Sequence, residues 1–205
     1  MHYLIESHRN AFELLENNPL YKPDWITLKS VIENITDKQL VAYFLEHSNH
    51  KNKSLSVALN KLLKDKLVVT GWRAESPIFQ DSNYLGNKWR LDFAKNSLAI
   101  EVGFNHSGVI AWNLTKLNLS SELNHVTKAI QTHIGIVITA TESLRKAGGF
   151  DSAIGTFEKF LTYLKPMQQM LTVPILVIGL EAPDTIKIIH EQQTPSKKIG
   201  IIQPI

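Results

Sequence analysis

The chain has 205 residues, of which 43% are hydrophobic and 20% are charged, and it contains no cysteine. This composition predicts one globular domain, leaves no room for a separate motor or methyltransferase domain, and excludes disulfides and thiolate metal sites. The net charge of +3 permits an anionic partner without requiring one. Because the N-terminus MHYLIESHRN lacks the apolar stretch of a signal peptide or membrane span, we expect a cytoplasmic protein with no membrane contact.

Helical patterns fill most of residues 1–70. Apolar side chains at helical spacing form one stripe in PDWITLKSVIENI, residues 23–35. Thr36 and Gln39 form the capping-box signature of the next helix, and KSLSVALNKLLKDKL predicts another. We therefore expect the first 70 residues to be mainly helical.

After Gly71 the pattern changes to strands, in KWRLDF, LAIEVGF, IGIVITAT and VPILVIGL. Helical stretches are expected between them at 115–132 and 152–164. Strands that alternate with helices predict an α/β sheet, and the last two apolar runs predict strands buried on both faces. We expect a single domain, 1–205, in which residues 71–181 form the α/β core and 182–205 form C-terminal strands or a tail.

The stretch KWRLDFAKNSLAIEVGF places Asp92 before a polar turn and Glu101 after it. If residues 96–97 make the two-residue turn of a hairpin, the two acids are direct cross-strand neighbours with Cβ atoms roughly 4.5–5.5 Å apart. Carboxylates that close repel one another unless a cation lies between them, and Mg²⁺ is a hard cation that takes carboxylate oxygens. The alternative is that Asp92 ends its strand in water and Glu101 forms an ion pair with Lys88 or Arg90.

The acids and their flanks resemble the PD-(D/E)XK nuclease core, and in detail the BglII/BstYI family of type II restriction endonucleases. In that family a similar strand carries Asp, eight residues, then Glu-Val-Gln followed by Phe. Here Asp92 is followed, after eight residues, by EVGF. The stretches VALNKLLKDKLVVTGW, SELNH and VPILVIGL are also similar in type and order, so the resemblance covers residues 50–181. It implies a restriction-endonuclease-like α/β fold, with a central mixed β-sheet, flanking helices and an antiparallel hairpin that carries the acids.

The resemblance also implies the chemistry. Asp92 and Glu101 are expected to hold Mg²⁺, with the backbone carbonyl of Val102 as a further ligand, and the ion activates water at the scissile phosphate. A homodimer is expected to cut both strands of a short palindrome in double-stranded DNA and to leave 5′-phosphate and 3′-hydroxyl ends. The expected helix 115–132 is the candidate dimer face. A DNA methyltransferase is expected in the same system, but not as a stable partner.

Gly103 departs from the family pattern, which has Gln there, while the wider superfamily has Lys or Glu. A glycine neither orients the attacking water nor donates to the phosphate. The candidates to replace the missing group are Asn105, His106 and Glu122. We favour Glu122, at the edge of the apolar stripe of the expected helix, although a solvated helix glutamate is the plain alternative.

The departure leaves two other functions open. A relative that lost turnover together with this position is a catalytically weakened DNA-binding protein. A repair or modified-base nuclease uses the same core without strict palindromic specificity. A plasmid cleavage assay separates both from a restriction enzyme, because the three predict different products.

The polar segment RKAGGFDSAIG lies between a buried strand and a helix that Asp151 or Ser152 is expected to cap. The plain interpretation is a strand-to-helix connection. In the BglII/BstYI pattern, the equivalent segment enters the major groove, which implies that Arg145 and Lys146 contact phosphates or guanine and that Asp151 accepts from a cytosine amino group. The expected DNA-binding residues are Asn105, His106, Arg145, Lys146, Gly148, Gly149, Asp151 and Ser152.

Overall fold

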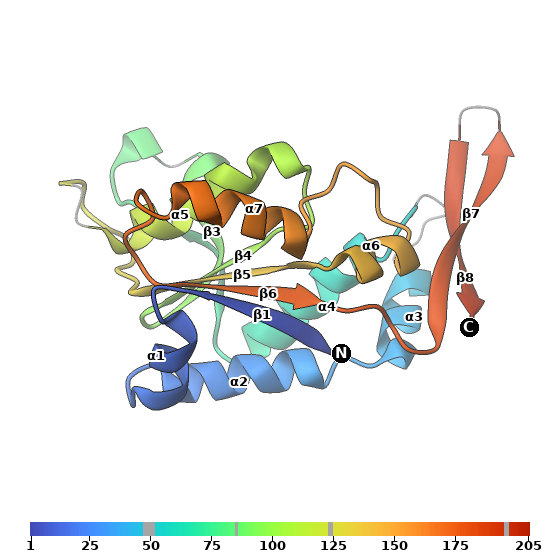
Figure 1. The fold of residues 1–205 in the computed structure, drawn as a ribbon, viewed down its shortest axis with the longest axis horizontal. Helices are drawn as coiled ribbons and strands as arrows, with labels where there is room; N and C mark the ends of the chain where they lie inside the picture. Colours follow the sequence, from blue (N-terminus) through green and yellow to red (C-terminus); the bar gives the residue numbers. More distant parts are fainter. Residues whose placement is uncertain (47–51, 85, 123–124, 195–196) are drawn as a thin grey trace.

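A six-stranded mixed sheet forms the centre of the molecule (Figure 1). The computed structural model describes residues 1–46, 52–84, 86–122, 125–194 and 197–205. Across the sheet the strand order is β1-β6-β5-β4-β3-β2, in which β4, β5 and β6 run parallel and the other neighbours pair antiparallel. The strands are β1 (Tyr3–His8), β2 (Arg73–Pro77), β3 (Arg90–Lys95), β4 (Leu98–Val102), β5 (Ile134–Ala140) and β6 (Ile175–Leu180).

Helices cover both faces of this sheet (Figure 1). Buried side chains of α1 to α4 pack with one face, and those of α5 and α7 pack with the other. The α/β fold predicted from the sequence is therefore confirmed, including the burial of every residue of β5 and β6. The helices are α1 (Ala11–Asn17), α2 (Lys22–Glu33), α3 (Asp37–Glu46), α4 (Ser56–Val69), α5 (Ile110–Ser121), α6 (Glu142–Ala147) and α7 (Phe157–Met167), with short 3-10 turns η1 (Ser82–Tyr84), η2 (Asn87–Trp89) and η3 (Ser107–Val109).

The capping box before α3 is formed as predicted. The backbone N–H of Thr36 donates to Gln39 Oε1 at 3.2 Å, and the N–H of Gln39 donates to Thr36 Oγ1 at 3.3 Å. Each side chain thus satisfies a backbone donor that the first turn of the helix leaves free. The sequence signal for α3 was therefore a local hydrogen-bond pattern, independent of the rest of the fold.

The first part of the chain is less uniformly helical than expected, because β1 pairs antiparallel with β6 at the edge of the sheet. Edge strands are covered incompletely, and Leu4 and Ile5 remain 45% and 36% exposed. The residues of β1 therefore do not alternate between apolar and polar types, which is the sequence pattern that predicts a half-buried strand. Its pairing joins the N-terminal residues to the sheet that carries the two acids.

The predicted helix 115–132 is wrong in its position. α5 ends at Ser121, and Glu122 already has an extended backbone. Residues 127–129 instead hydrogen-bond to the segment that follows β2: the N–H of Gln80 donates to Thr127 O, and the N–H of Ala129 donates to Ile78 O. The apolar side chains that suggested a longer helix are thus held by a non-local pairing that periodicity does not reveal.

The second expected helix, 152–164, is also displaced. α7 begins at Phe157 after Thr156, so neither Asp151 nor Ser152 caps it. A short helix that the sequence analysis missed, α6, follows β5 directly, and Thr141 Oγ1 caps it by accepting from the N–H of Leu144 at 3.2 Å.

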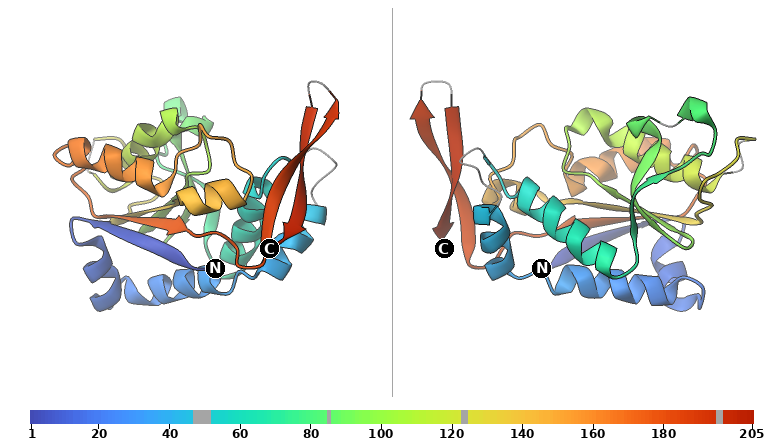
Figure 2. Two further views of the ribbon diagram at one scale, coloured as in Figure 1. Left: turned by 45° about the vertical axis from the view of Figure 1, so that its right-hand side comes forward. Right: turned by 180° about the vertical axis from the view of Figure 1, so that it is seen from behind.

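The C-terminal segment forms a two-stranded hairpin, β7 (Ile186–Thr194) and β8 (Lys197–Pro204), that is separate from the central sheet. It projects from one end of the molecule beside α3 and α6 (Figures 1 and 2). The buried Ile186 and Ile188 anchor its base in the main core. Over the described parts of the chain, no helix has the length and apolar character needed to cross a bilayer.

Candidate active site

The two acids lie on the hairpin formed by β3 and β4. Lys95 pairs with Leu98 and Phe93 with Ile100, so residues 96–97 form the turn where the sequence analysis placed it. Asn96 has a φ of 49°, the left-handed conformation that two-residue hairpin turns require and that Asn tolerates.

A buried carboxylate from the N-terminal helices holds this turn. Asp24 of α2 accepts a hydrogen bond from Asn96 Nδ2 at 2.7 Å, and its other oxygen lies 2.9 Å from Lys95 Nζ. The same ammonium donates to the carbonyl oxygen of Thr70 at 2.8 Å. The position of the hairpin that carries the two acids is thus fixed from outside the sheet.

The two strands of the hairpin separate at Asp92. Their recorded pairing stops at Phe93 and Ile100, and Asp92 Oδ2 accepts from the backbone N–H of Val102 at 2.7 Å. The expected direct pairing of Asp92 with Glu101 is therefore not formed, because the carboxylate takes the place of a backbone partner for β4.

Glu101 is buried, with 1% of its surface exposed. Its Oε2 lies 2.5 Å from Lys116 Nζ of α5, so the ion pair is with neither Lys88 nor Arg90. Its Oε1 is buried and has no hydrogen-bond partner among the described residues. A buried acceptor in this state costs free energy unless a ligand completes it.

The pKa values of both acids are raised. Burial, followed by the charge of Asp92, raises the pKa of Glu101 to about 8, against the opposing effect of Lys116. Burial also raises the pKa of Asp92, helped by the charge of Glu75 and opposed by the hydrogen bond from Val102 and the charge of Lys116. The two carboxylates therefore repel one another, as the sequence analysis expected, although they do not pair directly.

This shift predicts how the stability of the metal-free protein depends on pH. The pKa of Glu101 is higher in the folded protein than its ordinary value of 4.5, so stability from this group is present below pH 4.5 and is lost as the pH rises towards 8. In EDTA, we expect the melting temperature of the wild type to fall more steeply between pH 5 and pH 8 than that of Glu101→Gln. Parallel curves would contradict the shift.

A cleft of about 260 Å³ opens beside Asp92, between the strands and α4. Glu75 lies on its wall with a φ of 51°, an unusual conformation for a side chain of this type and one that is found at functional sites. Glu75 was not among the residues predicted from the sequence, because no local pattern marks this backbone conformation. The lining residues are Asn60, Lys64, Ala74, Glu75, Asp92, Phe93, Val102 and Asn105.

The chain that carries this hairpin matches a known protein family over most of its length. Residues 3–180 match the family model described as Restriction endonuclease BglII/BglIII. The chain belongs to this family. As a member of the BglII/BglIII family, it is a site-specific nuclease.

Solved structures agree on the fold. The chain resembles the crystal structure of BglII complexed with a DNA 16-mer, at 18% identity and a TM-score of 0.68, and that of free BglII, at 17% identity and a TM-score of 0.56. Each similarity covers 100% of both chains. No curated protein matches the chain significantly.

At Gly103 the chain departs from the family pattern, which has Gln, and the side chain of Phe160 fills the space beside this glycine. A Cβ atom built on Gly103 would lie 2.9 Å from two ring atoms of Phe160, which is itself fully buried in α7. A longer side chain therefore requires Phe160 to move. Gly103→Gln is therefore expected to crowd the core.

Glu122 lies away from the acids. It follows the last residue of α5, and its carboxylate accepts a hydrogen bond from Thr172 Oγ1, just before β6 begins. Glu101 and Val102 lie at the other end of the parallel strands. The catalytic role expected for Glu122 rested on a helix that the structure does not contain, and the geometry gives it no support.

Asn105 and His106 lie next to the predicted recognition segment. The carbonyl of Asn105 accepts from the N–H of Gly155 at 2.8 Å, and His106 forms a bridge with Ile154. Asn105 also lines the cleft beside Asp92. The structure thus brings these residues, which were predicted from different motifs, to one edge of the sheet.

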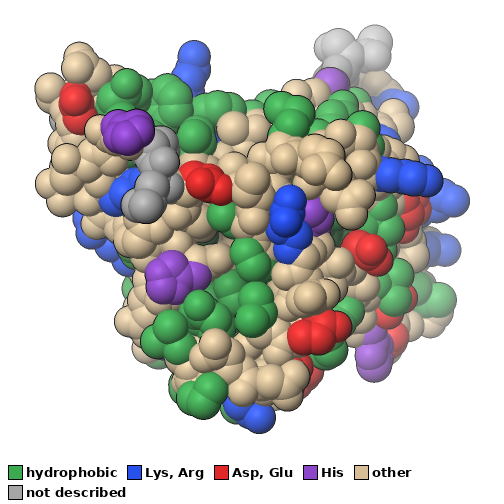
Figure 3. All heavy atoms as spheres, turned by 60° about the vertical axis from the view of Figure 1, so that its left-hand side comes forward, with side chains coloured by type: hydrophobic (Ala, Val, Ile, Leu, Met, Phe, Trp, Pro, Cys, Tyr) green, Lys and Arg blue, Asp and Glu red, His purple; other side chains and the backbone are tan. Residues whose placement is uncertain are grey.

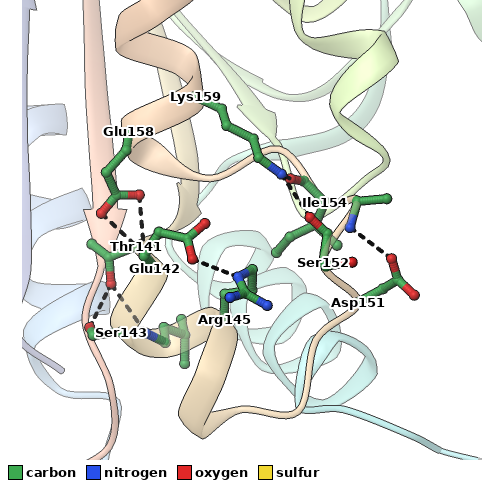
Figure 4. A network of polar contacts seen from close by, with 11 residues as sticks. Thr141, Glu142, Ser143, Arg145, Asp151, Ser152, Ile154, Glu158 and Lys159 are labelled. Carbon is green, nitrogen blue, oxygen red and sulfur yellow. Dashed lines mark hydrogen bonds and ion pairs between the residues drawn. The ribbon is translucent and has the colours of Figure 1, made fainter.

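The predicted recognition segment is held by its own polar contacts (Figure 4). Arg145 Nε is paired with Glu142 Oε2 at 2.7 Å, and Lys159 Nζ donates to the carbonyls of Ser152 and Ile154. Asp151 Oδ1 accepts from the N–H of Ala153 at 2.7 Å. Of the residues expected to contact DNA here, the side chains of Lys146, Asp151 and Ser152 are exposed, Arg145 is half-buried, and Gly148 and Gly149 are buried.

The double glycine has a structural reason of its own. Gly149 has a φ of +69°, and a Cβ there would meet Ile188 of β7 at 2.6 Å. Gly148 ends α6, and its carbonyl accepts from the N–H of Leu55. These glycines therefore let the recognition segment turn sharply against the C-terminal hairpin.

Proposed function

We propose that the chain is a type II restriction endonuclease that cuts double-stranded DNA at a short palindrome, requires Mg²⁺ and leaves 5′-phosphate ends. The observation that carries the proposal is the hairpin with two mutually repelling carboxylates, the half-buried Asp92 and the buried Glu101, in a chain of the BglII/BglIII family.

The donor set suits Mg²⁺. Asp92 and Glu101 are hard oxygen donors, and the unpartnered Oε1 of Glu101 leaves room for one more ligand bond. Val102, whose carbonyl is the third proposed ligand, is tied to Asp92 through its N–H. The described residues contain no group of three metal-ligating side chains, but Mg²⁺ needs only one or two carboxylates beside water and phosphate. Bound Mg²⁺ would supply an activated water and neutralise charge on the phosphate.

The proposed DNA-binding surface lies at the edge where β4 and β5 end. Lys64 and Asn105 line the cleft beside Asp92, and the exposed Lys146, Asp151 and Ser152 follow on the recognition segment. On the face in Figure 3, the described charged side chains of both signs stand among hydrophobic and uncharged ones. Positive charge is the usual footprint of a DNA-binding surface, and the exposed Lys64 and Lys146 supply two positive charges to the proposed edge. DNA is also present in the crystal structure of BglII that the chain resembles.

Plasmid digestion tests the proposal. With Mg²⁺ we expect discrete fragments, and with EDTA intact plasmid. A smear would instead indicate a nuclease without strict specificity, as in a repair or modified-base enzyme.

A second candidate, a catalytically weakened DNA-binding relative, is favoured by one observation. Phe160 fills the space beside Gly103, so no side chain projects from that position. Plasmid that stays intact in Mg²⁺ but is bound at a defined sequence would establish this alternative.

The recognition segment gives a prediction about specificity. Asp151→Ala is expected to relax the preference at one base pair, at a cost of about 1–3 kcal/mol, because its free carboxylate oxygen no longer accepts from a base. Lys146→Ala is expected to weaken all sequences alike, since a phosphate contact carries no base information. Binding-site selection with both variants measures this. An unchanged consensus for Asp151→Ala would contradict the role of the segment.

The remaining expectations follow from this function. A homodimer with two-fold symmetry would present one active site to each strand of a palindrome. The expected dimer face, helix 115–132, does not form as one helix, because α5 ends at Ser121. A cytoplasmic location and a companion DNA methyltransferase, acting separately, are part of the same proposal.

A further inference from the structure

A positive charge from another element contacts the catalytic hairpin. Lys116, in the middle of α5, is 8% exposed, and its Nζ lies 2.5 Å from Glu101 Oε2 and donates to the carbonyl oxygen of Arg90 at 3.0 Å. Among the described residues, it is the one cation recorded in an ion pair with either acid. Replacing both partners of a buried ion pair by apolar side chains is often neutral for stability, so stability alone does not explain why this pair is present. The pair therefore points to a role in function.

The missing group at position 103 belongs to the same face of the sheet. Residues two apart on a strand point to one face, so Glu101 and Gly103 share it. Glu101 meets Lys116 from α5 there, and Gly103 meets Phe160 from α7. With Phe160 blocking a side chain from β4, the polar group on this face comes from the helix above.

We propose that Lys116 is a catalytic residue: from α5 it supplies the positive group that Gly103 cannot supply from β4. In the DNA-free protein, the ammonium neutralises Glu101. With DNA bound, it contacts a non-bridging oxygen of the scissile phosphate. This inference rests on the proposed nuclease function of Asp92 and Glu101.

The physical reason is electrostatic preorganisation. Negative charge grows on the phosphate oxygens as the water attacks, and a fixed cation in a buried site stabilises that charge without first reorganising. Asp92 and Glu101 would hold a phosphate through the ion they bind, and Lys116 already contacts the Glu101 carboxylate at 2.5 Å. Lysine suits this task as a compact point charge on a flexible stem.

Single-turnover cleavage in Mg²⁺ is the first test. Lys116→Gln can still donate to Arg90 O but has no charge, and we expect it to cleave about a hundredfold to a thousandfold more slowly. Lys116→Arg keeps the charge, and we expect it to cleave at least about tenfold faster than Lys116→Gln. Lys165→Gln, which removes an exposed lysine on α7, is the matched control and should cleave at the wild-type rate.

Binding without cleavage is the second test, and a purely structural role would not affect it. In Ca²⁺, DNA affinity is measured by fluorescence anisotropy for duplexes with an ordinary phosphate or an uncharged methylphosphonate at the cleavage position. If Lys116 contacts that phosphate, the modification weakens binding about tenfold more in the wild type than in Lys116→Gln. An equal effect in both proteins would overturn the proposal.

The controls separate the possible failures. If Lys116→Gln melts well below the wild type, Lys116→Arg is used in its place. A loss of affinity for the methylphosphonate duplex as large as in the wild type supports the contact between residue 116 and the phosphate. No such loss overturns it. Should the wild type leave DNA intact, or Asp92→Ala cleave it, the proposed nuclease site fails. If the wild type cleaves, Asp92→Ala does not, and Lys116→Gln cleaves at the full rate, only the proposal for Lys116 is wrong.

Discussion

Asp92→Ala is expected to lower the single-turnover rate of DNA cleavage in Mg²⁺ by at least about a thousandfold, because the change removes one of the two carboxylates proposed to hold the ion. Sequence-specific binding in Ca²⁺ should remain measurable. It should also tighten, since a negative charge that faces the phosphate is gone. Rates are measured on a short duplex with enzyme in excess.

A matched carboxylate provides the control for this change. Asp184 is exposed, with 75% of its side chain accessible, and lies outside the cleft. Asp184→Ala makes the same change in net charge and should cleave like the wild type. Full Mg²⁺-dependent cleavage by Asp92→Ala would show that the hairpin is not the active site.

Asp24→Ala is expected to have the largest effect on stability. It leaves Lys95 without its carboxylate, removes the acceptor of Asn96 Nδ2, and so releases the turn of the catalytic hairpin. Removing one partner of a buried ion pair lowers the free energy of unfolding by about 3 kcal/mol at the low end of the usual range. The low end applies here because the Lys95 side chain is partly exposed. For a chain of this size, the melting temperature should fall by about 6–12 °C.

An exposed ion pair gives the comparison. Lys61 and Asp65 lie one helical turn apart on α4, with their charged atoms 2.8 Å apart, and roughly 40% of each side chain is exposed. Lys61→Met should cost less than about 1 kcal/mol. Similar melting temperatures for Asp24→Ala and Lys61→Met would mean that the turn is not held from α2.

Local signals in the sequence predicted much of the fold and the centre of the site. The capping box at Thr36, the uninterrupted apolar strands and the turn at 96–97 each depend on neighbouring residues alone. The resemblance then predicted a catalytic role for the hairpin, and family membership confirmed the kind of enzyme.

Non-local contacts account for what the sequence did not reveal. α5 stops early because residues 127–129 pair with the segment after β2. Lys116 and Glu75 were missed because they reach the acids from other elements, at no spacing that a motif records. The alternative interpretation of Glu101 was an ion pair with Lys88 or Arg90. An ion pair is formed, but its partner is Lys116, because the packing of α5 on the sheet brings that lysine to Glu101.

Sequencing the ends of cut DNA tests the central claim most directly. A library of random-sequence duplexes is digested with the wild type in Mg²⁺, and the ends that carry 5′-phosphates are captured and read. We expect one short palindromic sequence at every cut and no enriched ends with Asp92→Ala. Ends without a shared sequence, or the same ends from Asp92→Ala, would contradict the account of a site-specific endonuclease built on this hairpin.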